Sequence, residues 1–230
     1  MRIPSLSEPR NGRKLEGRHV ILFGAGTASE VGKGWSLRQE SDLVCGVGKA
    51  TALVYARHGA VVTCVDIDPD AASATAELIR REGGQAFSLA CNATRSHEVK
   101  ETIERSLAYN GRIDVLHNNI GIARVGGPVE CSEETFDEVI AVNLKSVYLT
   151  CKWTLPVMER QESGAIVNIS SFAATRFTVP WIGYAASKGG VNAMTMGIAA
   201  QYAPKGIRCN AIAPGLLSTP MVQVCPRGQP

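Results

Sequence analysis

Short apolar segments alternate along this chain with longer segments whose apolar residues recur at helical spacing. The short segments predict strands at 19–23, 60–66, 85–91, 113–119, 164–170 and 206–213. The longer segments predict helices at 48–59, 69–84, 95–111, 143–160 and 184–203. No hairpin dipeptide directly joins two of these strands, so each strand returns through a helix and pairs in parallel. We therefore predict a single α/β domain with a doubly wound parallel sheet, whose ligands bind at the carboxyl ends of the strands.

The composition argues against several classes of partner. The chain has 230 residues and a net charge of +3, and its basic residues are scattered, so we expect no nucleic acid as a partner. No apolar run approaches the roughly 20 residues that span a bilayer, and we expect no membrane contact. The polar start, residues 1–16, lacks a signal-peptide core. We expect it to be a disordered leader and the protein to be cytoplasmic.

The cysteines and histidines predict no metal site. The seven cysteines follow no framework spacing and include no CxxC pair, and the four histidines lie far apart in the sequence. Reduced thiols in the core or on the surface are the simpler interpretation.

The segment "SSFAATRFTVPWIGYAASKGG" (170–190) carries the strongest chemical signal. Tyr184 and Lys188 are four residues apart and share one face of a helix, and Ser171 follows the strand predicted at 164–170. A tyrosine hydroxyl titrates near 10, but a neighbouring ammonium favours the phenolate and brings the pKa toward working range. A serine hydroxyl can hold a substrate oxygen while the proton moves. This set predicts acid–base catalysis.

Together these motifs resemble those of the short-chain dehydrogenase/reductase family, from about Gly17 to Met221 but not across 27–45. The segment "NNIGI" (118–122) resembles the family's NNAG segment, "NLKSVYL" begins with Asn143, and "IAPGLLSTP" (212–220) resembles its PG segment. The resemblance implies a Rossmann-like fold and hydride transfer between a nicotinamide and an alcohol or ketone substrate. It implies the catalytic set Asn143, Ser171, Tyr184 and Lys188.

The resemblance also implies a cofactor site. Its expected contacts are Asn92, Asn118, Tyr184, Lys188, Pro214, Gly215 and Thr219, in addition to the glycine turn and Asp66. Lys188 would also bind the nicotinamide ribose hydroxyls, and Asn92 stands where the family usually has an aspartate that contacts adenine.

The glycine turn of such a site is split in this chain. Joining Gly26 to Gly46 across one residue restores a turn in which Gly24 permits the bend, Gly46 and Val47 let the backbone approach phosphate, and Gly48 lets the helix pack on the sheet. We interpret 27–45 as an insert without a function of its own. A P-loop is excluded because Ala50 follows Lys49 and Leu43 replaces the first glycine.

Asp66 ends the second predicted strand, where an acidic side chain would accept hydrogen bonds from the adenosine ribose and repel a 2′-phosphate. This position favours NAD, and NADP is not excluded because Lys33 or Arg38 in the insert could reverse the preference. A helix-capping aspartate is the alternative interpretation of Asp66.

The end of the chain also departs from the family pattern. Family members continue well past the PG segment, so we expect the last strand and the substrate lid to be missing. The domain would then span 17–221, with a tail at 222–230. A non-catalytic or cofactor-impaired variant that acts as an interaction protein stays open as the alternative function.

Two further expectations concern the substrate and the assembly. Phe172, Phe177, Trp181 and Ile182 suggest an apolar or ring-bearing substrate, or contact with a neighbouring subunit. The helices at 143–160 and 184–203 resemble those that pair between subunits, so a homodimer or homotetramer is expected.

Overall fold

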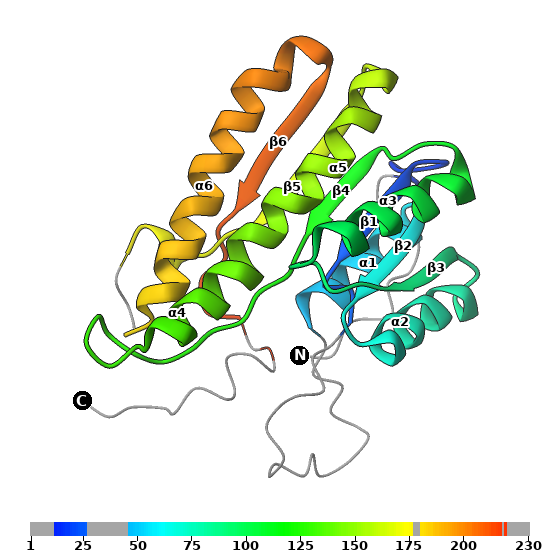
Figure 1. Ribbon diagram of the computed structural model, residues 1–230. Helices are drawn as coiled ribbons and strands as arrows, with labels where there is room; N and C mark the ends of the chain where they lie inside the picture. The colour runs from blue at the N-terminus through cyan, green and yellow to red at the C-terminus, as the bar shows by residue number, and fades with distance from the viewer. Residues whose placement is uncertain (1–11, 27–45, 177–179, 218, 220–230) are drawn as a thin grey trace, which may run out of the picture.

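The sheet has six parallel strands in the order β3-β2-β1-β4-β5-β6. The computed structural model describes residues 12–26, 46–176, 180–217 and 219 (Figure 1). Its strands are β1 (His19–Phe23), β2 (Val61–Asp66), β3 (Gln85–Ala90), β4 (Val115–Asn118), β5 (Gly164–Ile169) and β6 (Ile207–Ile212). The predicted doubly wound parallel sheet is confirmed, and within the described residues β6 is an edge strand.

Helices cover both faces of the sheet and form two apolar cores. On one face α1 (Val47–Arg57) and α2 (Pro69–Arg81) bury residues such as Leu53 and Ile79. On the other face, α3 (Ser96–Asn110), α5 (Ser146–Gln161) and α6 (Ile182–Tyr202) pack on a core that includes Phe23 and Leu116. Strands with both faces covered carry continuous apolar runs, and "HVILF" of β1 is buried at every position.

One helix extends further than the sequence prediction. The helix predicted at 143–160 is preceded by α4 (Glu133–Ile140) and a π-helical turn, Ala141–Lys145, before α5 begins. The Ser132 side chain caps α4 by accepting a hydrogen bond from the backbone N–H of Thr135. A serine followed by acidic residues is the usual signal for such a start, and it stands in the sequence as "SEET".

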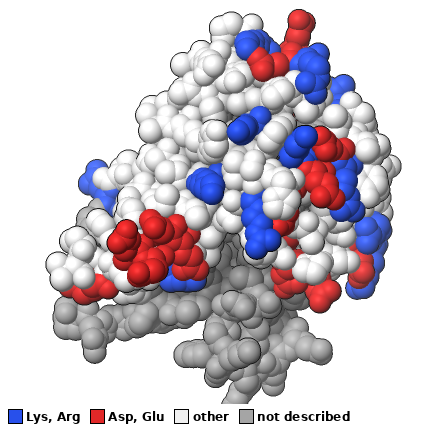
Figure 2. Space-filling view, in the orientation of Figure 1, with Lys and Arg blue, Asp and Glu red and all other residues white. Residues whose placement is uncertain are grey.

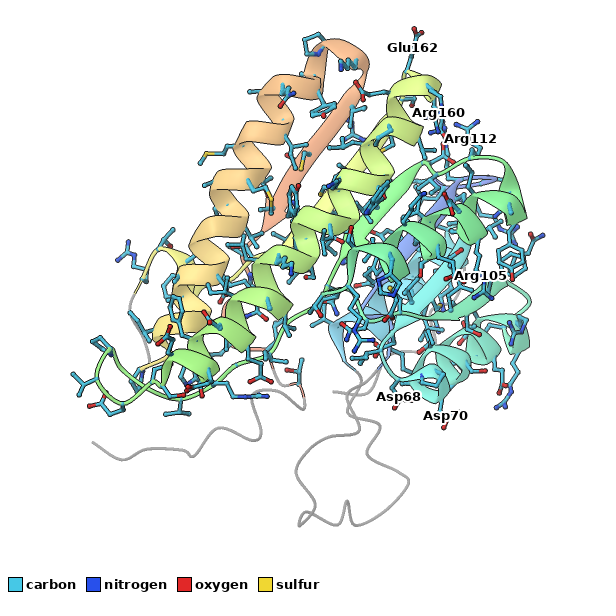
Figure 3. The ribbon with its side chains drawn as sticks, in the orientation of Figure 1. Asp68, Asp70, Arg105, Arg112, Arg160 and Glu162 are labelled. Atoms are coloured by element: carbon cyan, nitrogen blue, oxygen red, sulfur yellow. The ribbon has the colours of Figure 1, made fainter. Side chains whose placement is uncertain are left out.

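The chain order reverses between β1 and β4, which lie side by side although α1, β2, α2, β3 and α3 separate them in the sequence. At such a switch point the loops leave the carboxyl ends of the two strands in opposite directions and open a crevice. Figure 3 marks the two ends of the sheet. Asp68, after β2, lies at the carboxyl end, and Arg112 and Glu162, before β4 and β5, lie at the other end.

The described part of the chain contains no helix that is both long and apolar enough to span a membrane. The described cysteines, Cys64, Cys91, Cys131, Cys151 and Cys209, are all free thiols. No group of three or more potential metal ligands occurs in the same residues.

Candidate functional site

A cavity of about 520 Å³ lies at the carboxyl ends of the strands. Segments far apart in the sequence line it, from the glycine turn to the segment after β6. The predicted site residues that line it are Gly24, Gly26, Gly46, Val47, Asp66, Asn92, Ser171, Tyr184, Lys188, Pro214, Gly215 and Thr219. Three predicted site residues, Gly48, Asn118 and Asn143, are not among the lining residues.

The two halves of the glycine turn meet in space although 27–45 separates them in the sequence. Gly24 has a φ of +79°, and its N–H donates to the carbonyl of Val65 at 2.8 Å. A Cβ added at Gly48 would overlap the carbonyl of Gly24 and lie 2.7 Å from Nδ2 of Asn119. That Nδ2 donates to the Gly24 carbonyl at 3.0 Å. Gly48 therefore packs helix α1 against the turn, as predicted for the last glycine. The insert itself lies outside the described residues.

Asp66 ties the turn to the end of β2. Its Oδ2 accepts a hydrogen bond from the N–H of Gly26 at 2.8 Å, and its Oδ1 accepts one from the N–H of Asp68 at 3.2 Å. The cap of α2 is Asp68, whose side chain accepts from the N–H groups of Asp70 and Ala71. The alternative interpretation of Asp66 as the helix cap is therefore wrong. Its carboxylate faces the cavity beside the turn.

Tyr184 and Ser171 meet at the opposite end of the cavity. Ser171 follows β5, and its Oγ accepts a hydrogen bond from the N–H of Ala173 at 3.2 Å, which begins a short 3₁₀ turn. Burial raises the pKa of Tyr184 above its usual value, and a side-chain hydrogen bond with Ser171 opposes that rise. In this state Tyr184 is a protonated phenol held against the serine hydroxyl.

Lys188 lies one helical turn after Tyr184 and is 3% exposed. Its Nζ donates to the carbonyl of Ile169 at 2.8 Å and lies 5.7 Å from the centre of the Tyr184 ring. Desolvation by burial lowers the pKa of Lys188 to about 8. A buried ammonium with one carbonyl partner is destabilised in the folded protein, and such perturbed groups cluster at functional sites.

Asn143 does not line the cavity but holds segments that do. It is fully buried in the π-helical turn, where its Oδ1 accepts from the N–H of Ile122 at 2.8 Å. Its Nδ2 donates to the Ile122 carbonyl at 2.9 Å and to Ser187 Oγ at 3.1 Å. A Cβ added at Gly121 would lie 3.4 Å from Lys188 Nζ and 3.7 Å from Asn143 Oδ1. Asn143 thus clamps the loop after β4 against α6, close to the lysine.

Asn118 was expected at the cofactor, and here the structure requires a correction. Asn118 is 1% exposed, its Oδ1 accepts from Thr150 Oγ1 at 2.8 Å, and its Nδ2 donates to Asn168 Oδ1 at 2.8 Å. Because successive side chains of a strand point to opposite sides, only one of the paired asparagines can face the turn. That residue is Asn119, which the sequence analysis missed and which lines the cavity.

Asn92 lines the cavity, but part of its side chain is already engaged. Its Oδ1 accepts hydrogen bonds from the N–H of Thr94 at 3.1 Å and from Thr94 Oγ1 at 2.7 Å. The amide nitrogen is the part of this side chain that would be offered to a ligand.

The large apolar residues described between Ser171 and Tyr184 do not line the cavity. Phe172, Trp181 and Ile182 are not among its lining residues, and Phe177 lies outside the described residues. Apolar residues that do line it include Ile120, Ile122, Val142 and Leu217.

An ion pair that the sequence analysis did not identify lies at the cavity wall. Arg124 donates from Nε and Nη2 to both carboxylate oxygens of Glu138, at 3.1 and 2.9 Å. Figure 2 shows acidic side chains gathered over α4, the helix that carries Glu138. The positive charge at this wall is therefore compensated.

A doubly wound sheet with a glycine-lined cavity at its switch point is the architecture of dinucleotide-binding enzymes. The family model described as short chain dehydrogenase matches residues 43–229. The chain therefore belongs to the short-chain dehydrogenase/reductase family, and it is an oxidoreductase of that family.

Named relatives agree with this assignment. The chain is 39% identical over 213 residues to 3-oxoacyl-(acyl-carrier-protein) reductase FabG of Thermotoga maritima, covering 93% of this chain and 79% of that one. The crystal structure of levodione reductase has a TM-score of 0.81 at 30% identity, covering 91% and 76% of the two chains. The structure of NAD⁺-bound xylitol dehydrogenase has a TM-score of 0.77 at 29% identity, covering 88% and 71%.

Enzymes of this family use NAD or NADP, and the cavity fits such a group. Glycines leave backbone rather than side chains at the turn, and a Cβ at Gly26 would lie only 2.6 Å from Ala71 Cβ. The first residues of α1 stand at the same place, and the N–H groups of a helix N-terminus suit a pyrophosphate.

We expect Lys188→Met to stabilise the protein at pH 7. The Lys188 pKa of about 8 lies below the roughly 10.4 of an unfolded lysine, so below pH 8 the folded state carries a disfavoured charge. Between about pH 8 and 10.4, Lys188 is mostly protonated in the unfolded chain and mostly deprotonated in the folded protein. The free energy of unfolding of the parent should therefore rise with pH across this range. After the loss of the hydrogen bond to Ile169, the variant should gain about 1–3 kcal/mol at pH 7.

Urea unfolding across this pH range measures the effect. Lys152→Met, an exposed position on α5, is the matched control and should keep the parental pH dependence. A parent whose stability does not rise between pH 8 and 10.4, or a Lys188→Met variant that is less stable at pH 7, would contradict the expectation.

Proposed function

We propose that this oxidoreductase interconverts an alcohol and a ketone, with Tyr184 as the acid–base residue. The observation that supports the proposal most is the convergence of Ser171, Tyr184 and Lys188 on one cavity that also contains the glycine turn. The serine comes from the end of β5 and the other two residues from one face of α6. Tyrosine and lysine four residues apart place a cation beside a phenol.

The proposed roles follow from chemistry and position. The bound nicotinamide supplies the hydride chemistry, and the protein orients and polarises the substrate. Ser171 holds the substrate oxygen by a hydrogen bond. Tyr184 gives a proton to that oxygen in reduction and takes one from it in oxidation. Lys188 lies beside the Tyr184 ring and would bind the ribose hydroxyls.

The same reasoning assigns the remaining cavity residues. Gly24, Gly26, Gly46 and Val47 would approach the phosphates, with Gly48 packing α1 beneath them. Asp66 and Asn92 would face the adenosine, and Pro214, Gly215 and Thr219 the nicotinamide end. Asn143 would position Lys188 through the Gly121–Ile122 loop.

We propose NAD rather than NADP as the cofactor because Asp66 is the charged group beside the turn, followed by Ile67 and Asp68. A 2′-phosphate next to this carboxylate would be repelled. The NAD⁺-bound xylitol dehydrogenase among the similar structures is consistent with this preference.

Tyr184→Phe should abolish nearly all turnover, because the ring stays in place and only the hydroxyl is lost. We expect kcat to fall at least about 100-fold, within the range of general acid–base catalysis. Rates of cyclic ketone reduction and of secondary alcohol oxidation, followed by NADH absorbance, give this kcat. Tyr109→Phe, an exposed tyrosine stacked on Phe87, is the control and should keep parental turnover. More than about a tenth of the parental rate in Tyr184→Phe would show that another group moves the proton.

Asp66→Asn should narrow the preference for NADH over NADPH by at least about tenfold, which equals about 1.4 kcal/mol. The amide oxygen can still accept from Gly26. The change therefore removes the charge and the 3.2 Å hydrogen bond from the N–H of Asp68. Fluorescence titration with NADH and with NADPH gives the ratio of their two dissociation constants. Asp70→Asn, an exposed position in the first turn of α2, loses the same charge and should leave the ratio unchanged. Tighter binding of NADPH than NADH by the parent would overturn the assignment.

We also propose that the protein is a homodimer or homotetramer through α5 and α6. Tyr148 on α5 is 49% exposed and Met196 on α6 is 67% exposed, and a partner would cover them. Tyr148→Glu should shift the mass measured by light scattering toward the monomer. A parent that is monomeric at high micromolar concentration would refute the proposal.

A further inference from the structure

Trp181 contacts Tyr184 directly. The two rings meet edge to face, with centroids 5.7 Å apart and an interplanar angle of 84°. Aromatic pairs prefer this geometry because the positive edge of one ring meets the negative face of the other. On the same helix, Lys188 Nζ lies 5.7 Å from the Tyr184 ring centre. The phenol ring is thus in contact with an indole and close to a buried ammonium.

The backbone of Trp181 is anchored to the loop that follows β4. Gly126 and Trp181 form an isolated parallel bridge, in which the Gly126 N–H donates to the Pro180 carbonyl at 2.6 Å. The Ile182 N–H donates back to the Gly126 carbonyl at 3.1 Å. Gly126 has a φ of +151°, and a Cβ there would lie 3.1 Å from the Cys131 backbone. The start of α6 is therefore fixed on a second segment before it reaches Tyr184.

Trp181 is not among the residues that line the cavity. It contacts Tyr184 without facing the space that substrate and cofactor would share. Its described contact with the site is through the Tyr184 ring, and this contact can affect the orientation of that ring.

We propose that Trp181 is a positioning residue for Tyr184: its indole holds the phenol in the orientation in which the hydroxyl meets Ser171. The proposal rests on the proposed function of Tyr184. A change in χ1 of Tyr184 would swing the whole ring and move the hydroxyl away from the serine. Misplacement of a catalytic group by about 1 Å can cost about 100-fold in rate. The charged residues that line the same cavity are Lys188 on α6, Asp66 at the end of β2, Arg124 after β4 and Glu138 on α4.

The test compares Trp181→Ala, Trp181→Phe and Trp181→Leu in the full chain. Phenylalanine keeps an aromatic edge, and leucine fills space without one. We expect kcat for cyclic ketones with NADH to fall about 10- to 100-fold in the alanine and leucine variants, with KM within about threefold of the parent. The phenylalanine variant should stay within about threefold in both. Trp153→Phe is the control, since that indole donates to Ser96 between α3 and α5.

A second readout does not depend on turnover. Labelling the tyrosines with ¹³C at Cζ gives a Tyr184 resonance, assigned by its loss in Tyr184→Phe, whose pH titration reports the state of the phenol. The hydrogen bond with Ser171 opposes the rise that burial causes in the Tyr184 pKa. In Trp181→Leu, where leucine still covers the ring, a hydroxyl that has moved away from the serine should therefore titrate at a higher pH than in the parent. Trp181→Phe and Trp153→Phe should titrate like the parent.

Each outcome decides the proposal. A leucine variant with parental kcat, or with lost kcat and an unchanged Tyr184 titration, overturns it. If Trp181→Ala fails to fold, kcat and the Tyr184 titration are compared between Trp181→Phe and Trp181→Leu, and equal values in these two variants overturn the proposal. If the parent turns over no alcohol or ketone, the proposed function fails, and the NMR titration alone still shows whether Trp181 positions Tyr184.

Discussion

The site depends on the hydrogen bond from Asn119 Nδ2 to the carbonyl of Gly24. This bond joins the loops after β4 and β1, the two strands at which the chain order reverses. Gly48 fits directly against the same carbonyl, and no larger residue could. Through these contacts α1, β1 and β4 are held together at the cavity although 27–45 separates the two halves of the turn in the sequence. The two halves of the turn are thus held together by tertiary contacts. In an uninterrupted glycine turn, a short loop would hold them together.

A second set of contacts, made by buried polar side chains in the core, fixes the part of the cavity that contains Lys188. Asn118 and Asn168 are hydrogen-bonded to each other across β4 and β5, and they continue to Thr150 on α5 and Thr195 on α6. Buried polar groups specify a unique arrangement only when they are satisfied, and these four are joined in one chain of bonds. The next residue after Asn168 is Ile169, whose carbonyl accepts from Lys188. The network therefore sets the position of the lysine's partner.

The doubly wound parallel sheet and the Ser171–Tyr184–Lys188 set were predictable because they rest on local patterns. Alternating apolar and helical segments allow few topologies, and the four-residue spacing of Tyr184 and Lys188 places both on one helical face. The choice between Asn118 and Asn119 was not predictable, since the strand's end sets which side chain faces the turn. For Trp181 the sequence left contact with a substrate or with a neighbouring subunit open, because sequence spacing does not show which way an aromatic ring points. The start of α4 was overlooked although its capping serine is visible.

Burial acts in opposite directions on the two titratable groups of the site. It raises the pKa of Tyr184 above its usual value and lowers that of Lys188 to about 8, because each charged form loses solvation. In this state the lysine releases its proton at lower pH than the tyrosine does. The tyrosine is therefore neutral whenever the lysine is charged, and it is ready to donate a proton to a ketone oxygen. Alcohol oxidation needs the opposite state, a phenolate, and this requires further positive charge or hydrogen bonding near the ring. Ser171 provides one such hydrogen bond, and a positively charged group bound in the cavity would favour the phenolate further.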